Sequence, residues 1–321
     1  MSKYRIGIDI GGMSFKIGIV DENGNIAFRD VLKVTTNNSQ EEMIELLANK
    51  VNNLIEANDI SKSDILGICI GCPGSINSNT GVCDYSNNLK WENLPVVEII
   101  EKITNIKCKI TNDANAATLG EVKFGCGLGY KNVIMLTLGT GVGGGIVLNG
   151  TLYEGNEGKG AELGHAIIKV NGRRCTCGRK GCLEAYASTS ALIKDTKRLV
   201  SQNKQSKLWT ELKDFNLING KYIFEYAKQG DEVAVKALDN YINYLKEGIL
   251  NYCNIFRPEL IILGGGISAQ EDYILSRLIP LLEKEYYGFK NTPKVEIKCA
   301  KLGNDAGIIG AAYIILLSSL N

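Results

Sequence analysis

The 321-residue chain has almost no net charge, a single histidine and no apolar run long enough to cross a membrane. Its 36 lysines and arginines balance 35 aspartates and glutamates, so no surplus of positive charge predicts nucleic acid or an anionic membrane as a partner. The most apolar stretch, Ala306 to Leu320, is shorter than the roughly 20 residues that span a bilayer. We expect this stretch to form a buried terminal helix instead.

We also expect no secretory leader, because the first ten residues already carry an aspartate and no cleavage pattern follows. Ten cysteines without a leader favour a reducing compartment, where thiols bind metal more often than they pair as disulfides. Since 45% of the residues are hydrophobic and 22% are charged, the chain has enough apolar surface for the core of a globular protein. These features predict a cytoplasmic protein.

The single histidine, His165, lies ten residues before a cluster of three cysteines, Cys175, Cys177 and Cys182. One imidazole and three thiols match the ligand set of a closed tetrahedral zinc site. The alternative is three buried free cysteines beside an ordinary histidine, because unpaired thiols often act as small hydrophobic groups. If zinc binds, its four protein ligands leave no open position, which predicts a structural metal that positions its neighbours.

A glycine-turned pair of strands occurs twice along the chain. Residues Tyr4 to Val20 predict a strand, a glycine turn and a second strand. Residues Asn132 to Leu148 repeat this pattern, and the two segments align Gly11 with Gly139. A repeat of this kind indicates two related halves.

Strands and helices alternate along the rest of the chain. A capping box at Ser39 begins an amphipathic helix, and Ile65 to Ile70 reads as a buried strand. A helical stripe from Val235 to Ile249 precedes the strand Leu260 to Leu263, and the polar segment Ser201 to Gly220 reads as a helical surface insertion. This alternation predicts an α/β architecture.

Three glycine clusters follow predicted strands, at Gly11-Gly12, Gly139 to Gly145 and Gly264 to Gly266. The second cluster has G-x-G-x-x-G spacing, but a strand follows it where a dinucleotide-binding turn must open a helix. Glycine turns between strands gather backbone N–H groups where no side chain blocks an anion. Any one cluster alone is also explained as a tight turn without a ligand. Together they predict two turns that grip one polyphosphate and a third that leaves room for a base.

Asp113 is a candidate general base, because it lies between a strand end and an alanine-rich helix start. The alternative is that Asp113 only caps this helix. Phosphoryl transfer needs such a base together with a phosphate cradle and a divalent cation. Asp9, directly before the first glycine turn, would orient the water shell of magnesium or, alternatively, only begin the turn. Asn112 would hydrogen-bond a substrate hydroxyl.

Two further carboxylates accompany the cysteine cluster. Glu162 is three residues before His165, and Glu184 is two residues beyond Cys182, so the metal loop would hold both acids. Zinc would take one ring nitrogen of His165 and leave the other for a polar ligand. Because carboxylates accept hydrogen bonds from several hydroxyls, these side chains predict a polyhydroxylated ligand, and a sugar is the natural candidate.

Six motifs, spread over essentially the whole length of the chain, together resemble those of a known protein family. They are IGIDIGG, TNDANAA, LTLGTGVGGGIVLNG, AELGH, CTCGRKGCLEAYAS and LGGGIS. The chain resembles the ROK family of sugar kinases and related repressors, on the ribonuclease H-like actin/hexokinase fold. The resemblance implies an α/β fold of two lobes with an interlobe cleft. We expect one lobe to be residues 1–110, completed by a helix at 306–321, and the other to be residues 111–305 with the zinc-binding loop.

The resemblance also implies a role for each candidate residue. Asp113 would be the catalytic base. The sugar would contact Gly74, Asn88, Asn112, Glu162, His165 and Glu184. ATP with Mg²⁺ would contact Asp9, Gly11, Gly12, Gly139, Thr140, Gly141, Gly143, Gly264, Gly265 and Gly266. Structural Zn²⁺ would be held by His165, Cys175, Cys177 and Cys182.

The resemblance implies an ATP-dependent hexose kinase, most like the bacterial enzymes that make glucose 6-phosphate from glucose. N-acetylmannosamine and other hexoses (fructose, allose and mannose) are alternative substrates; Ser75 stands where the animal N-acetylmannosamine kinases have arginine. A non-catalytic sugar-sensing regulator is less favoured, because the first glycine turn begins within ten residues of Met1 and leaves no room for a preceding helix-turn-helix. A homodimer or homotetramer is the family expectation.

Overall fold

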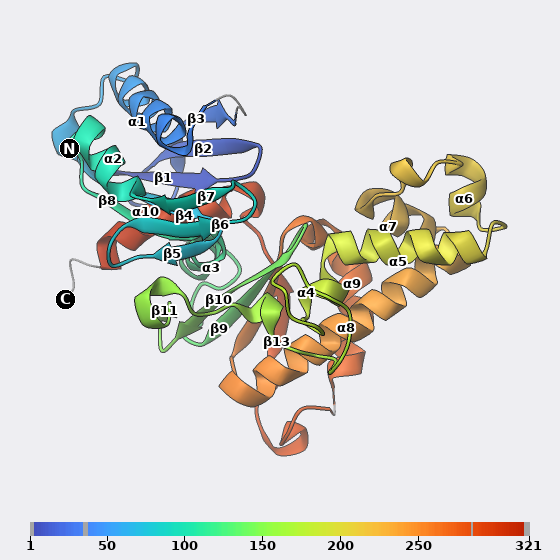
Figure 1. Ribbon diagram of the computed structural model, residues 1–321. Helices are drawn as coiled ribbons and strands as arrows, with labels where there is room; N and C mark the ends of the chain where they lie inside the picture. The colour runs from blue at the N-terminus through green and yellow to red at the C-terminus, as the bar shows by residue number, and fades with distance from the viewer. Residues whose placement is uncertain (1–2, 35–37, 284, 318–321) are drawn as a thin grey trace. The chain divides into compact units, whose positions relative to one another are not determined.

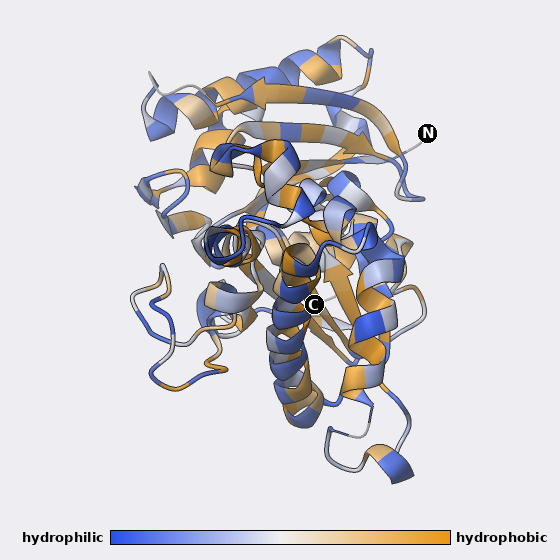
Figure 2. Cartoon of the chain, turned by 90° about the vertical axis from the view of Figure 1, so that its right-hand side faces the viewer, coloured by the Kyte–Doolittle hydropathy of each residue, from blue (hydrophilic) through white to orange (hydrophobic). Residues whose placement is uncertain are grey.

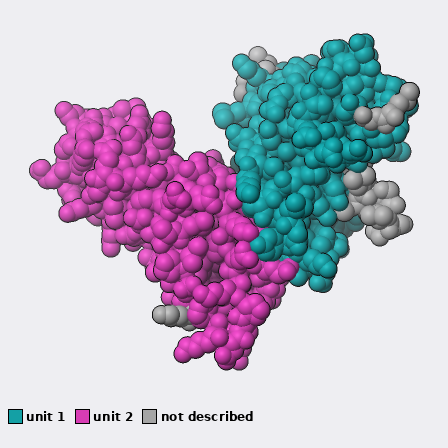
Figure 3. Space-filling model, turned by 180° about the vertical axis from the view of Figure 1, so that it is seen from behind, with its two compact units in different colours: residues 1–133, 145–161, 301–321 teal, residues 134–144, 162–300 magenta. Residues whose placement is uncertain are grey.

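The computed structural model describes residues 3–34, 38–283 and 285–317 (Figure 1). The chain divides into two compact units, shown in different colours in Figure 3. Unit 1 comprises Met1–Val133, Gly145–Ala161 and Lys301–Asn321. Unit 2 comprises Ile134–Gly144 and Glu162–Ala300.

Unit 1 contains a five-stranded sheet with the order β3-β2-β1-β4-β8. Its strands are β1 (Tyr4–Ile10), β2 (Ser14–Val20), β3 (Ile26–Lys33), β4 (Ile65–Cys72) and β8 (Cys108–Asn112). Strands β1, β4 and β8 are parallel, whereas β2 is antiparallel to both of its neighbours. The predicted strand, glycine turn and second strand between Tyr4 and Val20 are therefore confirmed.

Helices cover both faces of this sheet. They are α1 (Gln40–Glu56), α2 (Val96–Thr104), α3 (Asp113–Phe124) and α10 (Ala306–Leu317). A small antiparallel sheet of β5 (Ser75–Asn77), β6 (Val82–Ser86) and β7 (Trp91–Leu94) and three 3₁₀ turns, η1 (Lys62–Asp64), η2 (Asn156–Gly158) and η7 (Gly303–Asp305), complete the unit. The capping box at Ser39 is present, and the apolar C-terminal stretch is helical as expected from Ala306 to Leu317; its last residues, 318–320, lie outside the described part of the chain.

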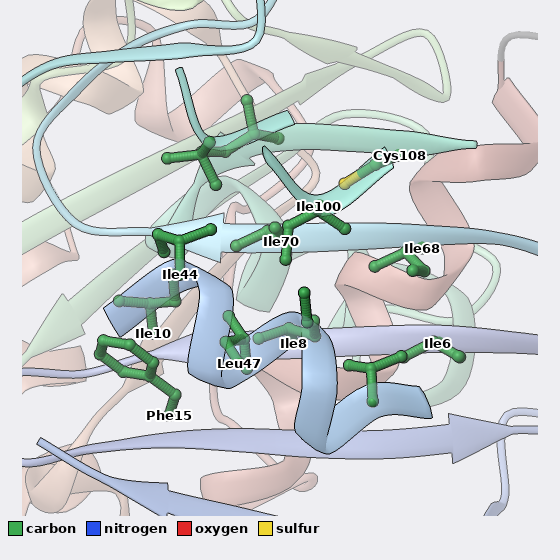
Figure 4. Close-up of a cluster of buried hydrophobic side chains, with 14 of the residues drawn as sticks. Ile6, Ile8, Ile10, Phe15, Ile44, Leu47, Ile68, Ile70, Ile100 and Cys108 are labelled. Atoms are coloured by element: carbon green, nitrogen blue, oxygen red, sulfur yellow. The ribbon is translucent and has the colours of Figure 1, made fainter. Parts of the chain in front are cut away.

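Alternation along β1 decides which helices lie on each face. Successive strand residues point to opposite faces, and Ile6, Ile8 and Ile10 pack with Ile44 of α1 and Ile100 of α2 in one core cluster (Figure 4). The residues between these isoleucines therefore face α10 on the other side of the sheet.

Glycine permits a close approach of α10 to the sheet and to α3. A Cβ added at Gly7 would collide with the carbonyl oxygen of Ile308, and one at Gly310 would collide with the carbonyl oxygen of Ala116. Only glycine fits at these two positions, because the backbone of another element lies where a side chain would begin. The buried strands carry mostly hydrophobic residues, whereas several helices at the surface alternate hydrophilic and hydrophobic ones (Figure 2).

The second five-stranded sheet has the order β11-β10-β9-β12-β13. Its strands are β9 (Val133–Leu138), β10 (Val142–Leu148), β11 (Thr151–Tyr153), β12 (Leu260–Gly264) and β13 (Glu296–Cys299). The repeated strand-turn-strand unit predicted between Asn132 and Leu148 is β9 and β10, so that prediction is confirmed. The chain passes along β10 from unit 2 into unit 1 at Gly145.

The remaining helices belong to unit 2. They are α4 (Glu184–Ala187), α5 (Thr189–Gln202), α6 (Lys207–Leu212), α7 (Gly220–Lys228), α8 (Glu232–Phe256) and α9 (Glu271–Leu282), with the 3₁₀ turns η3 (Leu163–His165), η4 (Phe215–Leu217), η5 (Gly266–Gln270) and η6 (Phe289–Asn291). The segment 201–220 is helical in part, through the end of α5, α6 and η4. Within the described part of the chain, no helix is both long and apolar enough to traverse a lipid bilayer.

The compact units differ from the expected lobe boundaries of 1–110 with 306–321 and 111–305. Residues 111–133 belong to unit 1, because α3 packs against α10. Residues 145–161 also belong to unit 1, and a Cβ at Gly145 would meet Thr118 of α3. Contacts made by α3 therefore account for both differences.

Candidate functional site

The site of unit 1 lies at the carboxyl ends of three parallel strands. In the sheet register, Asp9 of β1 is opposite Gly71 of β4, and Gly71 is opposite Thr111 of β8. Parallel strands end at one edge of a sheet, which is where open α/β folds bind their ligands. The first glycine turn after β1 and Asp113 after β8 are therefore brought to the same edge.

Asp113 is the first residue of α3, and Asn112 is its N-cap. The side-chain Oδ1 of Asn112 accepts a hydrogen bond from the backbone nitrogen of Ala114 at 2.9 Å. The N-cap position is therefore Asn112 and not Asp113, although Oδ1 of Asp113 accepts from the same Ala114 nitrogen at 2.9 Å, so the two side chains share this N–H group. A Cβ added at Gly71 would lie 3.4 Å from the Cα of Asp113, so the first turn of α3 packs closely on the end of β4.

Gly74 and Asn112 meet beside Asp113. The side-chain Nδ2 of Asn112 donates to the carbonyl oxygen of Gly74 at 3.4 Å. Gly74 has a φ of +125°, and a Cβ there would collide with the carbonyl oxygen of Tyr85, so only glycine fits. Asn88 is exposed in the turn between β6 and β7.

Asp9 carries an ion pair that the sequence reasoning missed. The Nζ of Lys16 lies 2.9 Å from the Oδ2 of Asp9, and both side chains are partly buried. The signal was present in the sequence, because a tight turn centred on Gly12 and Met13 places residue 9 opposite residue 16. The turn itself leaves space for a ligand, since a Cβ at Gly12 would meet no heavy atom within 4 Å.

In unit 2 the second glycine turn is tied to α4 and α5. The nitrogen of Gly139 donates to the carbonyl oxygen of Gly141 at 3.0 Å, which closes the turn. The nitrogen of Thr189 donates to the carbonyl oxygen of Gly139 at 2.8 Å. Since β10 begins at Val142, Gly143 lies in the strand and outside the turn.

The third glycine cluster packs beside this turn. Gly265 has a φ of +81°, and a Cβ there would lie 2.5 Å from the carbonyl oxygen of Leu138, the last residue of β9. A Cβ at Gly139 or Gly266 would instead meet no heavy atom within 4 Å. The backbone therefore holds Gly265 in place, while the space beside the other two glycines is open to a ligand.

A pocket of about 600 Å³ in unit 2 joins the glycine turn to the cysteine loop. Its walls include Thr140, Cys175, Thr176 and Glu184. The Thr176 hydroxyl, which the sequence reasoning also missed, donates to the Oε1 of Glu184 at 2.8 Å. A candidate phosphate-binding residue and a candidate sugar-binding residue thus line one pocket.

The predicted metal ligands gather in unit 2. The ligand atoms of His165, Cys175, Cys177 and Cys182 all lie within 4.8 Å of one another. The Nδ1 of His165 is 3.6 Å from the Sγ of Cys175, and the Sγ atoms of Cys177 and Cys182 are 3.7 Å apart. A tetrahedral zinc with ordinary bond lengths separates two sulfurs by about 3.8 Å and a sulfur from a nitrogen by about 3.6 Å. These four side chains therefore fit zinc.

The other ring nitrogen of the histidine faces a carboxylate. The Nε2 of His165 lies 4.0 Å from the Oε2 of Glu162 across the short η3 turn. Desolvation by the surrounding protein raises the pKa of Glu162, the nearby His165 opposes this, and repulsion from Glu184 adds to it. An acceptor-rich surface therefore adjoins the cysteine cluster.

The candidate residues divide between the two units. Unit 1 carries Asp9, Gly11, Gly12, Gly74, Asn88, Asn112 and Asp113, and unit 2 carries Gly139, Thr140, Gly141, Gly143, Glu162, His165, Cys175, Cys177, Cys182, Glu184, Gly264, Gly265 and Gly266. In each unit, polar side chains and a glycine turn occur together.

Comparison with known proteins gives a consistent result. A sequence model of the ROK family matches residues 5–317. The glucokinase of Thermotoga maritima is 37% identical over 313 residues, which are 97% of this chain and 96% of that protein. The similarity therefore extends over almost the full length of both proteins.

Solved structures are similar over the same length. A ROK family glucokinase from Streptomyces griseus, in complex with glucose and AMPPNP, has a TM-score of 0.83 at 31% identity and covers 97% of this chain and 98% of that chain. A protein from Listeria monocytogenes described as a possible N-acetylmannosamine kinase has a TM-score of 0.79 at 25% identity and covers 99% of this chain and 100% of that chain. The expected α/β fold of the two-lobed actin/hexokinase type is confirmed.

Proposed function

Because this chain belongs to the ROK family, we propose that it is an ATP-dependent hexose kinase that converts glucose to glucose 6-phosphate. One observation carries the proposal most directly. Asp113 and the first glycine turn follow parallel strands that end at the same edge of the unit 1 sheet. A general base beside a phosphate-binding turn is the arrangement that phosphoryl transfer to an alcohol requires.

Asp113 acts as the base that takes the proton of the sugar's 6-hydroxyl as that oxygen attacks the terminal phosphorus of ATP. The carboxylate lies on the first turn of α3, where the cap made by Asn112 holds the helix start in place. The same asparagine, together with Gly74 and Asn88, contacts the sugar hydroxyls. The proton leaves the hydroxyl as the new P–O bond forms and ADP departs.

Unit 2 supplies acceptors for the sugar and backbone N–H groups for the nucleotide. Glu162, His165 and Glu184 bind sugar hydroxyls, and Thr140 with its neighbouring glycines binds phosphoryl oxygens. The pocket lined by Thr140 and Glu184 supports this assignment, because a sugar bound at Glu184 and a phosphoryl group bound at Thr140 would share one pocket. In the glycine cluster Gly264–Gly266, the open space beside Gly266 leaves room for the base of the nucleotide.

Two metals accompany this function. Asp9 would orient the water shell of magnesium, which would supply charge neutralisation for the phosphoryl groups. Zinc held by His165, Cys175, Cys177 and Cys182 is structural and orders the loop that carries the sugar-side acids. The close match of ligand separations to a zinc tetrahedron supports this second assignment.

N-acetylmannosamine is the second candidate substrate, because the Listeria protein shares the fold over nearly the whole chain. Fructose, allose and mannose are further candidates within the family. A location in the cytoplasm and assembly as a homodimer or homotetramer remain predictions from the sequence.

The proposal is tested by a coupled assay of ADP release with glucose, N-acetylmannosamine, fructose, allose and mannose as acceptors. We expect the highest kcat/KM with glucose. If another of these sugars has the highest kcat/KM, that sugar replaces glucose as the proposed substrate, and the proposed hexose kinase activity stands. A non-catalytic sugar sensor would instead show sugar-dependent thermal stabilisation without ADP release from any acceptor, and this result would overturn the proposal.

A further inference from the structure

Lys16 and Asp9 form an ion pair at the ligand-binding edge of the unit 1 sheet, and the hairpin register explains it. The two residues are direct partners across the antiparallel β1–β2 pair, so their side chains lie on the same face of the sheet. The distance from Lys16 Nζ to Asp9 Oδ2 is 2.9 Å. The exposed fractions are 35% for the lysine and 20% for the aspartate, so solvent and ligands still reach both groups.

The face that carries this pair is covered by α10. A Cβ added at Gly307 would lie 3.0 Å from the Cγ and 3.1 Å from the Oδ1 of Asp9. Gly307 is the second residue of α10, whose positive N-terminal dipole favours a carboxylate there. The Asp9 carboxylate therefore lies close to the first turn of α10 on its Oδ1 side and pairs with Lys16 at Oδ2.

The contact with Asp9 leaves the ammonium group of Lys16 with further hydrogen-bond donors. A lysine ammonium has three N–H donors, and among the described residues Lys16 donates to one acceptor, Asp9 Oδ2. The glycine turn beside it, Gly11 to Ser14, contains no cationic side chain, and the sequence has no P-loop lysine. The turn leaves open space at Gly12, and Lys16 is the cationic residue nearest to it in the sequence.

We propose that Lys16 is a phosphate-binding residue that donates to a phosphoryl oxygen of the bound nucleotide and holds Asp9 in place when the nucleotide is absent. The inference rests on the proposed function, in which this turn binds the nucleotide. A lysine is a compact point charge on a flexible stem, suited to moving between a carboxylate and a phosphoryl oxygen. When the ammonium turns to the nucleotide, Asp9 Oδ2 becomes free to accept from water around the accompanying divalent cation.

The test compares ADP binding by Lys16→Met, Lys16→Arg and Lys33→Met with that of the unchanged protein, measured by calorimetry in EDTA. Lys33 is the matched control, since it is exposed on β3 and pairs in register with Ser14 at the same turn. We expect Lys16→Met to weaken ADP binding about tenfold or more, because a charge-assisted hydrogen bond is lost. Lys16→Arg retains most of the affinity, and Lys33→Met binds as the unchanged protein does. ADP affinity unaltered by Lys16→Met would overturn the inference.

A second comparison separates direct phosphate contact from support of Asp9. In an Asp9→Asn background, a lysine that acts only through Asp9 has nothing left to position, so Lys16→Met would then have no effect on ADP binding. We expect the same loss, about tenfold, in this background as in the unchanged protein. Additivity supports direct contact, and disappearance of the effect contradicts it.

These binding measurements do not depend on sugar turnover. If the unchanged protein releases no ADP with any sugar but binds ADP through Lys16, the proposed activity fails and the inference holds. If glucose is phosphorylated and ADP binding is insensitive to Lys16, the inference fails and the activity holds.

Discussion

The carboxylate of Glu184 accepts a hydrogen bond from the backbone nitrogen of Val142, with 3.1 Å between Oε2 and N. This bond joins the first residue of α4 to the first residue of β10, immediately after the second glycine turn. A Cβ at Gly141 would approach the same Oε2 to 2.5 Å, so the turn packs directly on the carboxylate. A residue that we assign to the sugar therefore also fixes the turn that we assign to the nucleotide.

Glu184→Gln should weaken both functions of this side chain. Oε2 accepts from Val142 and Oε1 accepts from Thr176, and an amide can replace only one of these acceptors. We expect a rise of about tenfold in the KM for the sugar and a loss of about 1 kcal/mol in the free energy of unfolding. Steady-state kinetics and urea unfolding measure the two effects.

The control for this variant is Glu225→Gln, an exposed glutamate on α7. It should leave both the KM and the unfolding free energy unchanged. A Glu184→Gln enzyme with the same sugar KM as the control would remove Glu184 from sugar binding.

Gly139→Val tests whether the open space beside the second turn belongs to the nucleotide. A Cβ at Gly139 meets no heavy atom within 4 Å, and its φ is not in the left-handed region. We therefore expect the free energy of unfolding to change by no more than about 0.5 kcal/mol. The KM for ATP should rise about tenfold or more, because the branched side chain occupies space that the phosphate needs.

The corresponding measurement combines denaturant unfolding with ATP titration at saturating sugar. A variant that keeps the ATP KM of the unchanged protein would show that the space is not used by the nucleotide.

Metal analysis of the purified protein should find about one zinc per chain. Cys177→Ser removes one ligand of the cluster, and we expect it to lose most of the zinc, to melt at a lower temperature and to bind the sugar more weakly. The physical reason is that the proposed zinc would order the loop that leads into α4, where Glu184 is the first residue. Elemental analysis, thermal unfolding and sugar titration measure the three effects.

Cys299→Ser is the matched control, since Cys299 lies at the end of β13 and outside the ligand cluster. It should keep the zinc of the unchanged protein. Full activity in protein stripped of zinc would contradict a structural role for the metal.

Local sequence patterns were sufficient to predict the elements that carry the site. The alternation of Tyr4 to Ile10, the glycine turn after it and the capping box at Ser39 each depend on residues that are near neighbours in the chain. The histidine and the three cysteines were found in the same way, because their spacing is short.

Features that depend on distant contacts were missed. The inclusion of α3 in unit 1 follows from backbone contact between Gly310 and Ala116, almost two hundred residues apart in a chain whose local pattern there predicts only a helix. The pairing of Thr176 with Glu184 likewise depends on how the cysteine loop folds.

The central claim is that Asp113 takes the proton of the sugar hydroxyl. Its most direct test is single-turnover phosphoryl transfer from ATP to glucose by Asp113→Asn, with glucose binding and thermal unfolding measured on the same sample. The account predicts retained folding and glucose affinity and a transfer rate lower by about a hundredfold to ten-thousandfold. A transfer rate close to that of the unchanged protein would contradict it.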